Sequence, residues 1–157
     1  MAGKKQRKRS ATTHLGVAAR IARTALAGRL ATLDLYPGQD TVLLAISEED
    51  GVSLRELAER LSVRPPTITK TVTRLIAQGL VEKRGSERDG RQSHAHLTDK
   101  GAAIVDAVGA ARKAIDRAAL AGFSGRERKT LRKLLRRMAQ NLADTGATPA
   151  MDISAGD

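Results

Sequence analysis

The segment from residue 53 to residue 101 constrains the fold of this chain more than any other feature. It reads SLRELAERLSVRPPTITKTVTRLIAQGLVEKRGSERDGRQSHAHLTDKG. Apolar residues recur at helical spacing in two successive runs that a short polar break separates. Two short alternating stretches follow, on either side of a charged loop that contains glycine. The pattern predicts two helices around a tight turn and then a β-hairpin.

The first helix of the segment has a marked beginning. Ser53 is followed three residues later by Glu56, the spacing of a capping box that satisfies backbone NH groups at a helix N-terminus. The small side chain of Ala58 allows a second helix to cross closely over the first. Residues 62–63 form the turn between them.

The second helix begins near Arg64, because Pro65 has the fixed φ and missing NH that suit a first helical position. Its predicted buried stripe comprises Ile68, Val72, Leu75 and Ile76. The remaining surface carries Arg64, Pro66, Thr67, Thr69, Lys70, Thr73 and Arg74. This surface holds hydroxyls and cations without a carboxylate, which suits the major groove of DNA. The alternative is an ordinary solvated helix face.

The hairpin projects a charged tip. Gly79 ends the second helix, and strands are expected at residues 80–84 and 92–97. The loop between them carries Arg88, Asp89 and Arg91. An arginine beside a DNA-reading helix can enter the adjacent minor groove, whose negative potential attracts cations. Asp89 would then brace Arg91.

The segment resembles the MarR family of bacterial transcriptional regulators. The shared pattern appears as SLRELAERL from Ser53, PPTITKTVTRL from Pro65, GLV at Gly79, DGR at Asp89, LT at Leu97 and KG at Lys100. LYPGQ from Leu35 extends the resemblance over most of residues 13–143. Two positions depart from the family pattern. Arg64 replaces a small capping residue at some loss of capping, and Thr71 replaces an aliphatic residue, which is expected to loosen packing slightly.

The resemblance implies a mainly α fold with a small β-hairpin wing, a winged helix-turn-helix. It also implies an intertwined homodimer held by the N- and C-terminal helices, in which Arg91 reaches the minor groove. A dimer would place two DNA-reading helices roughly 34 Å apart, so its operator should be an imperfect palindrome.

Composition limits the alternatives. The chain of 157 residues suits one domain, with 41% hydrophobic residues but one Tyr, one Phe and no Trp. It has no cysteine, which excludes disulfides, thiolate metal sites and thiol-based sensing. No apolar run is long enough to span a membrane, and arginines interrupt the only candidate signal-peptide stretch. We therefore expect a cytoplasmic protein, associated with the nucleoid when bound to DNA.

Charge is distributed unevenly. The net charge is +11, and no Asp or Glu precedes Asp34. The first residues form a predicted disordered basic arm, whose candidate DNA contacts are Lys4, Lys5, Arg7, Lys8 and Arg9. A solvated tail without a role is an alternative. An organelle transit peptide also fits an Arg-rich, acid-free start, but not the bacterial resemblance.

Helices expected at residues 13–33, 99–121 and 124–143 expose more apolar surface than one small domain covers, which indicates a partner chain. A further helix is expected at residues 37–47. The resulting organisation is a disordered arm (1–11), a helical dimerisation region (12–36 and 99–144), a DNA-binding winged helix-turn-helix (37–98) and a disordered tail (145–157).

A small-molecule effector is a further expected partner, because family members bind anionic or phenolic molecules between the dimer helices and the winged domain. Candidate lining residues, by location only, are His14, Arg20, Arg23, Arg29 and Tyr36. The excess of arginine suits a carboxylate or an acyl-CoA, but it equally suits DNA or an ordinary helix surface.

No catalytic, metal or cofactor site is expected. His94 and His96 alternate on the returning strand without a third ligand nearby, and both are expected to face solvent or phosphate, with Ala95 and Leu97 on the inner face. Glycine-rich phosphate loops and catalytic groupings are absent from the sequence. The prediction is a palindrome-binding repressor that an effector releases. The alternative is an architectural or protein-binding winged-helix protein.

Overall fold

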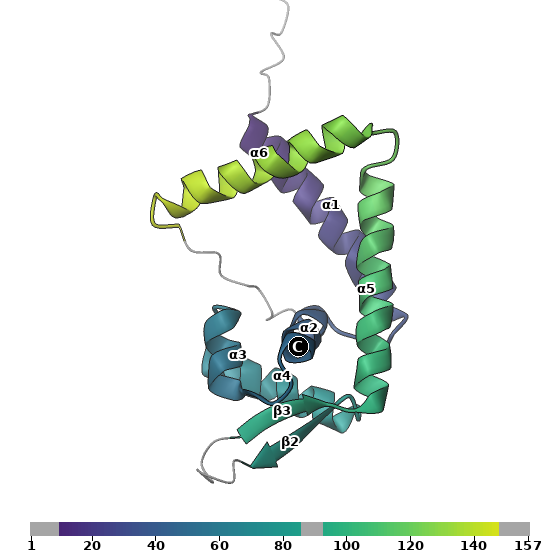
Figure 1. Ribbon diagram of the computed structural model, residues 1–157, viewed down its shortest axis with the longest axis vertical. Coiled ribbons are helices and arrows are strands. Elements are labelled where there is room, and N and C mark those ends of the chain that lie inside the picture. Colours follow the sequence, from purple (N-terminus) through teal and green to yellow (C-terminus); the bar gives the residue numbers. More distant parts are fainter. Residues whose placement is uncertain (1–9, 86–92, 148–157) are drawn as a thin grey trace, which may run out of the picture.

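The computed structural model describes residues 10–85 and 93–147 (Figure 1). Its elements, in chain order, are α1 (Ala11–Ala31), α2 (Gln39–Glu48), β1 (Val52–Ser53), α3 (Leu54–Arg60), α4 (Pro65–Ala77), β2 (Val81–Gly85), β3 (Ser93–Leu97), α5 (Asp99–Ala119) and α6 (Gly125–Ala143). Each helix expected from the sequence is present, with boundaries within two residues of those expected. The first helix begins at Ala11 because Ser10 caps it, its hydroxyl accepting from the amide of Thr13.

The sheet is antiparallel with strand order β1-β3-β2. Strands β2 and β3 pair from Val81 with Leu97 to Gly85 with Ser93. Strand β1 was not expected, since two residues give no alternating pattern to detect. It pairs Val52 with Ala95 on the far edge of β3. The sheet therefore joins the hairpin to the segment just before α3.

The hydrophobic core lies between the sheet and helices α2, α3, α4 and the first part of α5. Its largest fully buried side chains include Leu43, Ile46, Leu57, Ile68 and Leu75. Aliphatic residues fill the core, as the near absence of aromatic residues requires. One member of the predicted stripe of α4 was assigned wrongly. Ile76 is 37% exposed, because it lies at the edge of the stripe.

Helices α1, α5 and α6 extend away from this core (Figure 1). Helix α5 begins beside the sheet and packs against α1, and α6 follows a turn at the far end of α5. Large apolar side chains stay exposed on this extension, namely Val17, Ile21, Leu134, Leu135 and Leu142. Within the described residues, the model contains no helix with the length and apolar character that crossing a membrane requires.

Candidate DNA-binding surface

Helix α3 begins with a complete capping box. The Ser53 hydroxyl accepts from the amide of Glu56 at 3.2 Å, and the Glu56 carboxylate accepts from the Ser53 amide at 3.0 Å and from its hydroxyl at 2.8 Å. These hydrogen bonds from Ser53 lower the pKa of Glu56. The box fixes where α3 starts, directly after the strand that pairs with β3.

The turn between α3 and α4 is tight. Ser62 adopts a left-handed conformation with φ of 51°, and the amide of Val63 donates to the carbonyl of Ala58 at 2.9 Å. Ala58 is buried at the crossing, as its small size predicts. Arg64 is the N-cap of α4, and within the described residues its side chain makes no capping hydrogen bond. Its guanidinium is therefore not used to hold the helix terminus.

Helix α4 buries one face and exposes the other. Ile68, Val72 and Leu75 are almost fully buried. On the other face the exposed residues are Arg64, Pro66, Thr69, Lys70, Thr73 and Arg74, and Thr67 is half-buried beside them. The residues singled out from the sequence therefore share one surface of the helix. Thr71, which departs from the family pattern, is buried instead and donates to the carbonyl of Thr67 at 3.0 Å.

The exposed threonines have their hydroxyl protons engaged. Thr69 donates to the carbonyl of Pro65 at 3.0 Å, and Thr73 donates to that of Thr69 at 2.8 Å. In this state each hydroxyl oxygen can only accept a further hydrogen bond. The exocyclic amino groups of adenine and cytosine are donors in the major groove, and the thymine methyl suits a threonine methyl. This face can therefore contact base edges as well as phosphates.

The C-terminal end of α4 is fastened to the start of α5. Gly79 has φ of 72°, the left-handed conformation expected for it. The Thr98 hydroxyl donates to the Gly79 carbonyl at 2.7 Å, and the Lys100 ammonium donates to the Gln78 carbonyl at 2.9 Å. A Cβ added to Gly101 would lie 2.0 Å from the Leu80 carbonyl oxygen. The LT and KG motifs thus hold the end of α4 in place.

A second set of contacts joins α4 to the α1–α2 turn. The buried Gln39 accepts from the amide of Tyr36 at 2.9 Å and donates to the side-chain oxygen of Gln78 at 2.9 Å. Gln78 in turn donates to the carbonyl of Asp34 at 2.8 Å. Sequence reasoning missed these contacts, because the partners are about 40 residues apart and no local pattern shows that Gln39 and Gln78 pair.

Asp40, the second residue of α2, forms an ion pair with Arg112 of α5. The Asp40 side chain is only 6% exposed, and one of its oxygens accepts from the Arg112 guanidinium at 2.6 Å. The same guanidinium lies 3.4 Å from the Thr41 hydroxyl. Gln39 and Asp40 together link the start of α2 to α4 on one side and to α5 on the other. Arg112 was not expected to have this role, since it lies in a solvent-facing run of α5.

The hairpin carries the wing. Its strands pair as predicted, and β2 begins one residue later than expected. The three charged residues proposed for its tip, Arg88, Asp89 and Arg91, lie outside the described residues, as do the arm residues Lys4, Lys5, Arg7, Lys8 and Arg9. Their contacts therefore stay predictions.

The expectation for His96 was wrong. Its side chain is 16% exposed and its Nδ1 lies 3.1 Å from a carboxylate oxygen of Asp50, so the residues just before β1 cover the ring on the face of the sheet opposite to Ala95. Gly51 makes room for this ring, since a Cβ there would lie 2.9 Å from it. Ala95 is fully buried, as expected. Within the described ranges, no group of three or more His, Cys, Asp or Glu side chains is arranged to hold a metal ion.

The residues considered for effector binding are distributed along α1 and its following turn. His14, Arg20, Arg23, Arg29 and Tyr36 are all exposed. His14 and Arg29 are roughly 22 Å apart at 1.5 Å per residue, so one small molecule cannot contact all of them in a single chain. They line neither the groove between α5 and α6 nor the one between α3 and α4. Their role stays a prediction.

Known proteins share this architecture. A family model described as the MarR family matches residues 34–92. The uncharacterized HTH-type transcriptional regulator YybA of Bacillus subtilis is 29% identical over 110 residues, covering 70% of this chain and 73% of YybA. Alignments with three further curated regulators span only 33–51% of their lengths.

Two solved structures extend the comparison. A MarR protein from Peptoclostridium difficile matches with a TM-score of 0.76 and 26% identity, covering 92% of this chain and 95% of that protein. A mutant MarR from E. coli, complexed with operator DNA, matches with a TM-score of 0.71 and 25% identity, covering 81% and 91%. The expected winged helix-turn-helix fold is confirmed.

Proposed function

We propose that this chain is a DNA-binding transcriptional regulator of the MarR family, whose members are not enzymes, and that it is a repressor that binds a palindromic operator as a homodimer. The observation that carries the proposal is the exposed face of α4. It gathers hydroxyls and cations without a carboxylate, on a helix fixed at both ends. We assign α4 to the major groove, where its hydroxyls and cations contact base edges and phosphates.

A second copy of the chain completes the molecule. The apolar side chains exposed on α1 and α6 support an interface between copies, since monomeric proteins seldom expose contiguous apolar patches of this kind. We assign residues 12–36 and 99–144 to this interface and residues 37–98 to DNA binding. Two copies of α4 would then lie about one helical turn of DNA apart, roughly 34 Å, and read half-sites about ten base pairs apart.

The wing and the arm contribute contacts of different kinds. Arg88 and Arg91 reach the minor groove beside α4, with Asp89 bracing Arg91. The arm neutralises phosphates through Lys4, Lys5, Arg7, Lys8 and Arg9 and adds affinity for any duplex. The E. coli MarR complexed with operator DNA supports DNA binding by this fold, because the two folds superpose over most of both chains.

Release by an effector is the regulatory part of the proposal. A small anionic or phenolic molecule binds between α1 and the winged domain and favours a dimer whose half-site spacing does not match the operator. The contacts of Gln39 and Asp40 support this route, because they connect α4 to the α1–α2 turn and to α5. Repression follows from occupation of promoter DNA.

The test is footprinting on the DNA that flanks the protein's own gene, repeated with a panel of small carboxylates and phenols. We expect protection of one imperfect palindrome, and loss of that protection with at least one compound. A competition assay follows at physiological salt, with a short duplex that contains the palindrome and an excess of random DNA.

The competition result separates this proposal from an architectural protein. A regulator retains the palindromic duplex, whereas a protein that compacts DNA without sequence preference loses it to the excess. Equal affinity for both duplexes would refute the proposed function.

A further inference from the structure

Helix α6 is the most strongly charged element among the described residues. Between Gly125 and Ala143 it contains seven Lys or Arg residues and one carboxylate, Glu127. Glu127 is engaged at the helix N-terminus, where it accepts from the Ser124 amide at 2.8 Å and from its hydroxyl at 2.7 Å. These hydrogen bonds lower the pKa of Glu127, so it stays ionised at the cap.

Five of the cations share one side of the helix. At 100° per residue they fall within an arc of roughly 100°, while the apolar residues occupy the opposite arc. The five are Arg126, Lys129, Lys133, Arg136 and Arg137, which we call the α6 basic stripe. All five are exposed. The apolar arc comprises Leu131, Leu134, Leu135, Met138 and Leu142.

The charge of the stripe is not neutralised within the described part of the chain. No carboxylate in residues 10–85 or 93–147 forms an ion pair with any of its members. The Arg136 guanidinium donates only to the carbonyl of Arg132, at 3.4 Å, which leaves its charge unpaired. Over the roughly 16 Å from Arg126 to Arg137, the stripe therefore presents five positive charges.

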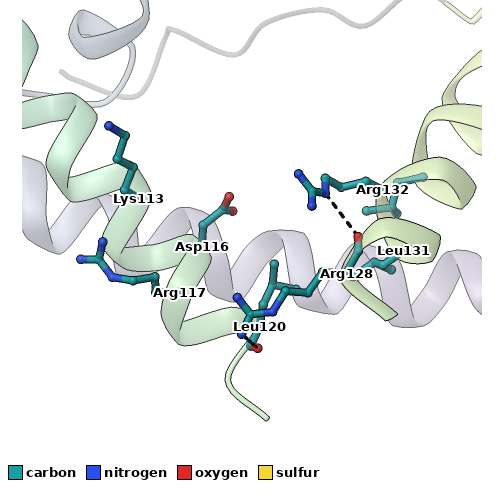
Figure 2. Close-up of a pocket in the computed structure, with 8 residues that line it drawn as sticks. Lys113, Asp116, Arg117, Leu120, Arg128, Leu131 and Arg132 are labelled. Atoms are coloured by element: carbon teal, nitrogen blue, oxygen red, sulfur yellow. Dashed lines mark hydrogen bonds between the residues drawn. The ribbon is translucent and has the colours of Figure 1, made fainter. Parts of the chain in front are cut away.

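Figure 2 shows the residues that line the groove between α5 and α6. This groove lies on a different side of α6 from the α6 basic stripe. Leu120, Leu131 and Leu135 are among the residues that line this groove of about 390 Å³. The Arg128 guanidinium donates to the carbonyls of Leu120 at 3.1 Å and Phe123 at 3.0 Å. These bonds fix the corner between α5 and α6, so the stripe is held in a defined orientation.

The stripe is remote from the surface that we assign to the operator. Helix α5 separates them, with α4 and the sheet near its first residues and α6 beyond its last (Figure 1). A helix of 21 residues is roughly 31 Å long. A duplex bound by α4 therefore cannot also lie against α6 of the same chain.

We propose that the α6 basic stripe binds a second segment of duplex DNA, so that one dimer holds two duplexes at once. The inference rests on the proposed function, because a second copy covers the apolar arc of α6 and leaves the cations as its exposed side. An anionic membrane would need the apolar arc for insertion. Duplex DNA can be bound by a row of cations alone, because they neutralise its phosphates. A length of 16 Å of duplex presents roughly nine phosphates.

The experiment measures bridging directly. Duplexes that contain the selected palindrome are attached to beads, the full chain is bound, and a fluorescent duplex without the palindrome is added. The test variant carries Lys129→Gln, Lys133→Gln and Arg136→Gln. We expect it to bind the beads as the unmodified chain does, but to capture about tenfold less fluorescent duplex, with a log–log salt slope for capture lower by about 2 to 3.

The matched control carries Lys129→Arg, Lys133→Arg and Arg136→Lys, which keeps the charge. It should capture the second duplex normally. Equal capture by the glutamine variant would overturn the inference and assign bridging to another segment, such as the arm, which every variant retains. Helix content and melting temperature of both variants show that each is folded.

Two further outcomes separate the possible failures. If the unmodified chain does not bind the palindrome on the beads, the proposed function fails. If it binds the palindrome but captures no second duplex, the inference alone fails. Vesicles that contain phosphatidylglycerol are tested in parallel. Stripe-dependent binding to these vesicles without capture of a second duplex would overturn the inference in favour of a membrane partner.

Discussion

Gly101 sets the distance between α5 and the end of α4. A Cβ at this position would lie 2.0 Å from the Leu80 carbonyl oxygen. That segment cannot easily move away, because Thr98 donates hydrogen bonds to the carbonyls of both Gly79 and Leu80. The missing side chain is therefore what allows α5 to begin so close to α4. The KG motif of the sequence has this packing as its physical basis.

Replacing Gly101 with Ala should destabilise the protein by about 1 to 3 kcal/mol, because the methyl group forces the two segments apart. Denaturant unfolding followed by circular dichroism measures the change. Gly109→Ala in the same helix is the control, since a Cβ there meets nothing within 4 Å. The control should keep or raise stability, by up to about 1 kcal/mol. Equal effects of the two substitutions would contradict this account.

A substitution of Arg74 tests the proposal that α4 binds the major groove. Arg74→Ala should weaken operator binding by about 1 to 3 kcal/mol, and Arg91→Ala in the wing should act similarly, since each removes a base or groove contact. Fluorescence anisotropy with the palindromic duplex measures both. Lys113→Ala, an exposed cation on α5, should leave the affinity unchanged. If Arg74→Ala reduced operator affinity no more than Lys113→Ala, the proposal that α4 binds the major groove would be refuted.

At the scale of elements, the pair of Asp40 and Arg112 holds α2 against α5. Arg112→Ala leaves a nearly buried carboxylate without its cation and should destabilise the protein by about 1 to 3 kcal/mol, less than for a fully buried pair because the arginine is 42% exposed. Adding Asp40→Asn should recover part of the loss. A double-mutant cycle from urea unfolding measures the coupling. Strictly additive effects would show that the two residues do not interact.

The helices and the wing strands could be predicted because their signals are local. The capping box of Ser53 and the left-handed Gly79 marked helix ends, and the spacing of Ile68, Val72 and Leu75 marked a buried face. Ile76 was misassigned because periodicity does not show where a stripe ends. Strand β1 has only two residues and pairs with a distant strand, so no local signal reveals it.

The connections between elements had no such signal. Asp40 and Arg112 are 72 residues apart, and Gln39 and Gln78 are 39 apart. A polar residue at the start of a helix is ordinary in a sequence, and only the packed structure shows that it is buried and paired. The exposed surface of α4 was nevertheless identified correctly, since it is the complement of a buried stripe within one helix.

At the scale of the whole molecule, we expect the net charge of +11 to contribute DNA affinity that does not depend on base sequence. Removing residues 1–9 deletes five cations from the arm. This deletion should weaken binding to the palindrome and to random duplexes by the same factor, because phosphate contacts carry no sequence information. Titrations of both duplexes at several salt concentrations measure it. A loss confined to the palindrome would assign the arm to base reading instead.

We propose that two copies of the chain bind one palindromic duplex together. Sedimentation of the protein with the selected palindrome, and with the same duplex after one half-site is scrambled, tests it most directly. We predict a complex of two chains per duplex whose affinity falls at least about tenfold when one half-site is lost. A complex of one chain per duplex, or an affinity unchanged by the scrambled half-site, would contradict the account.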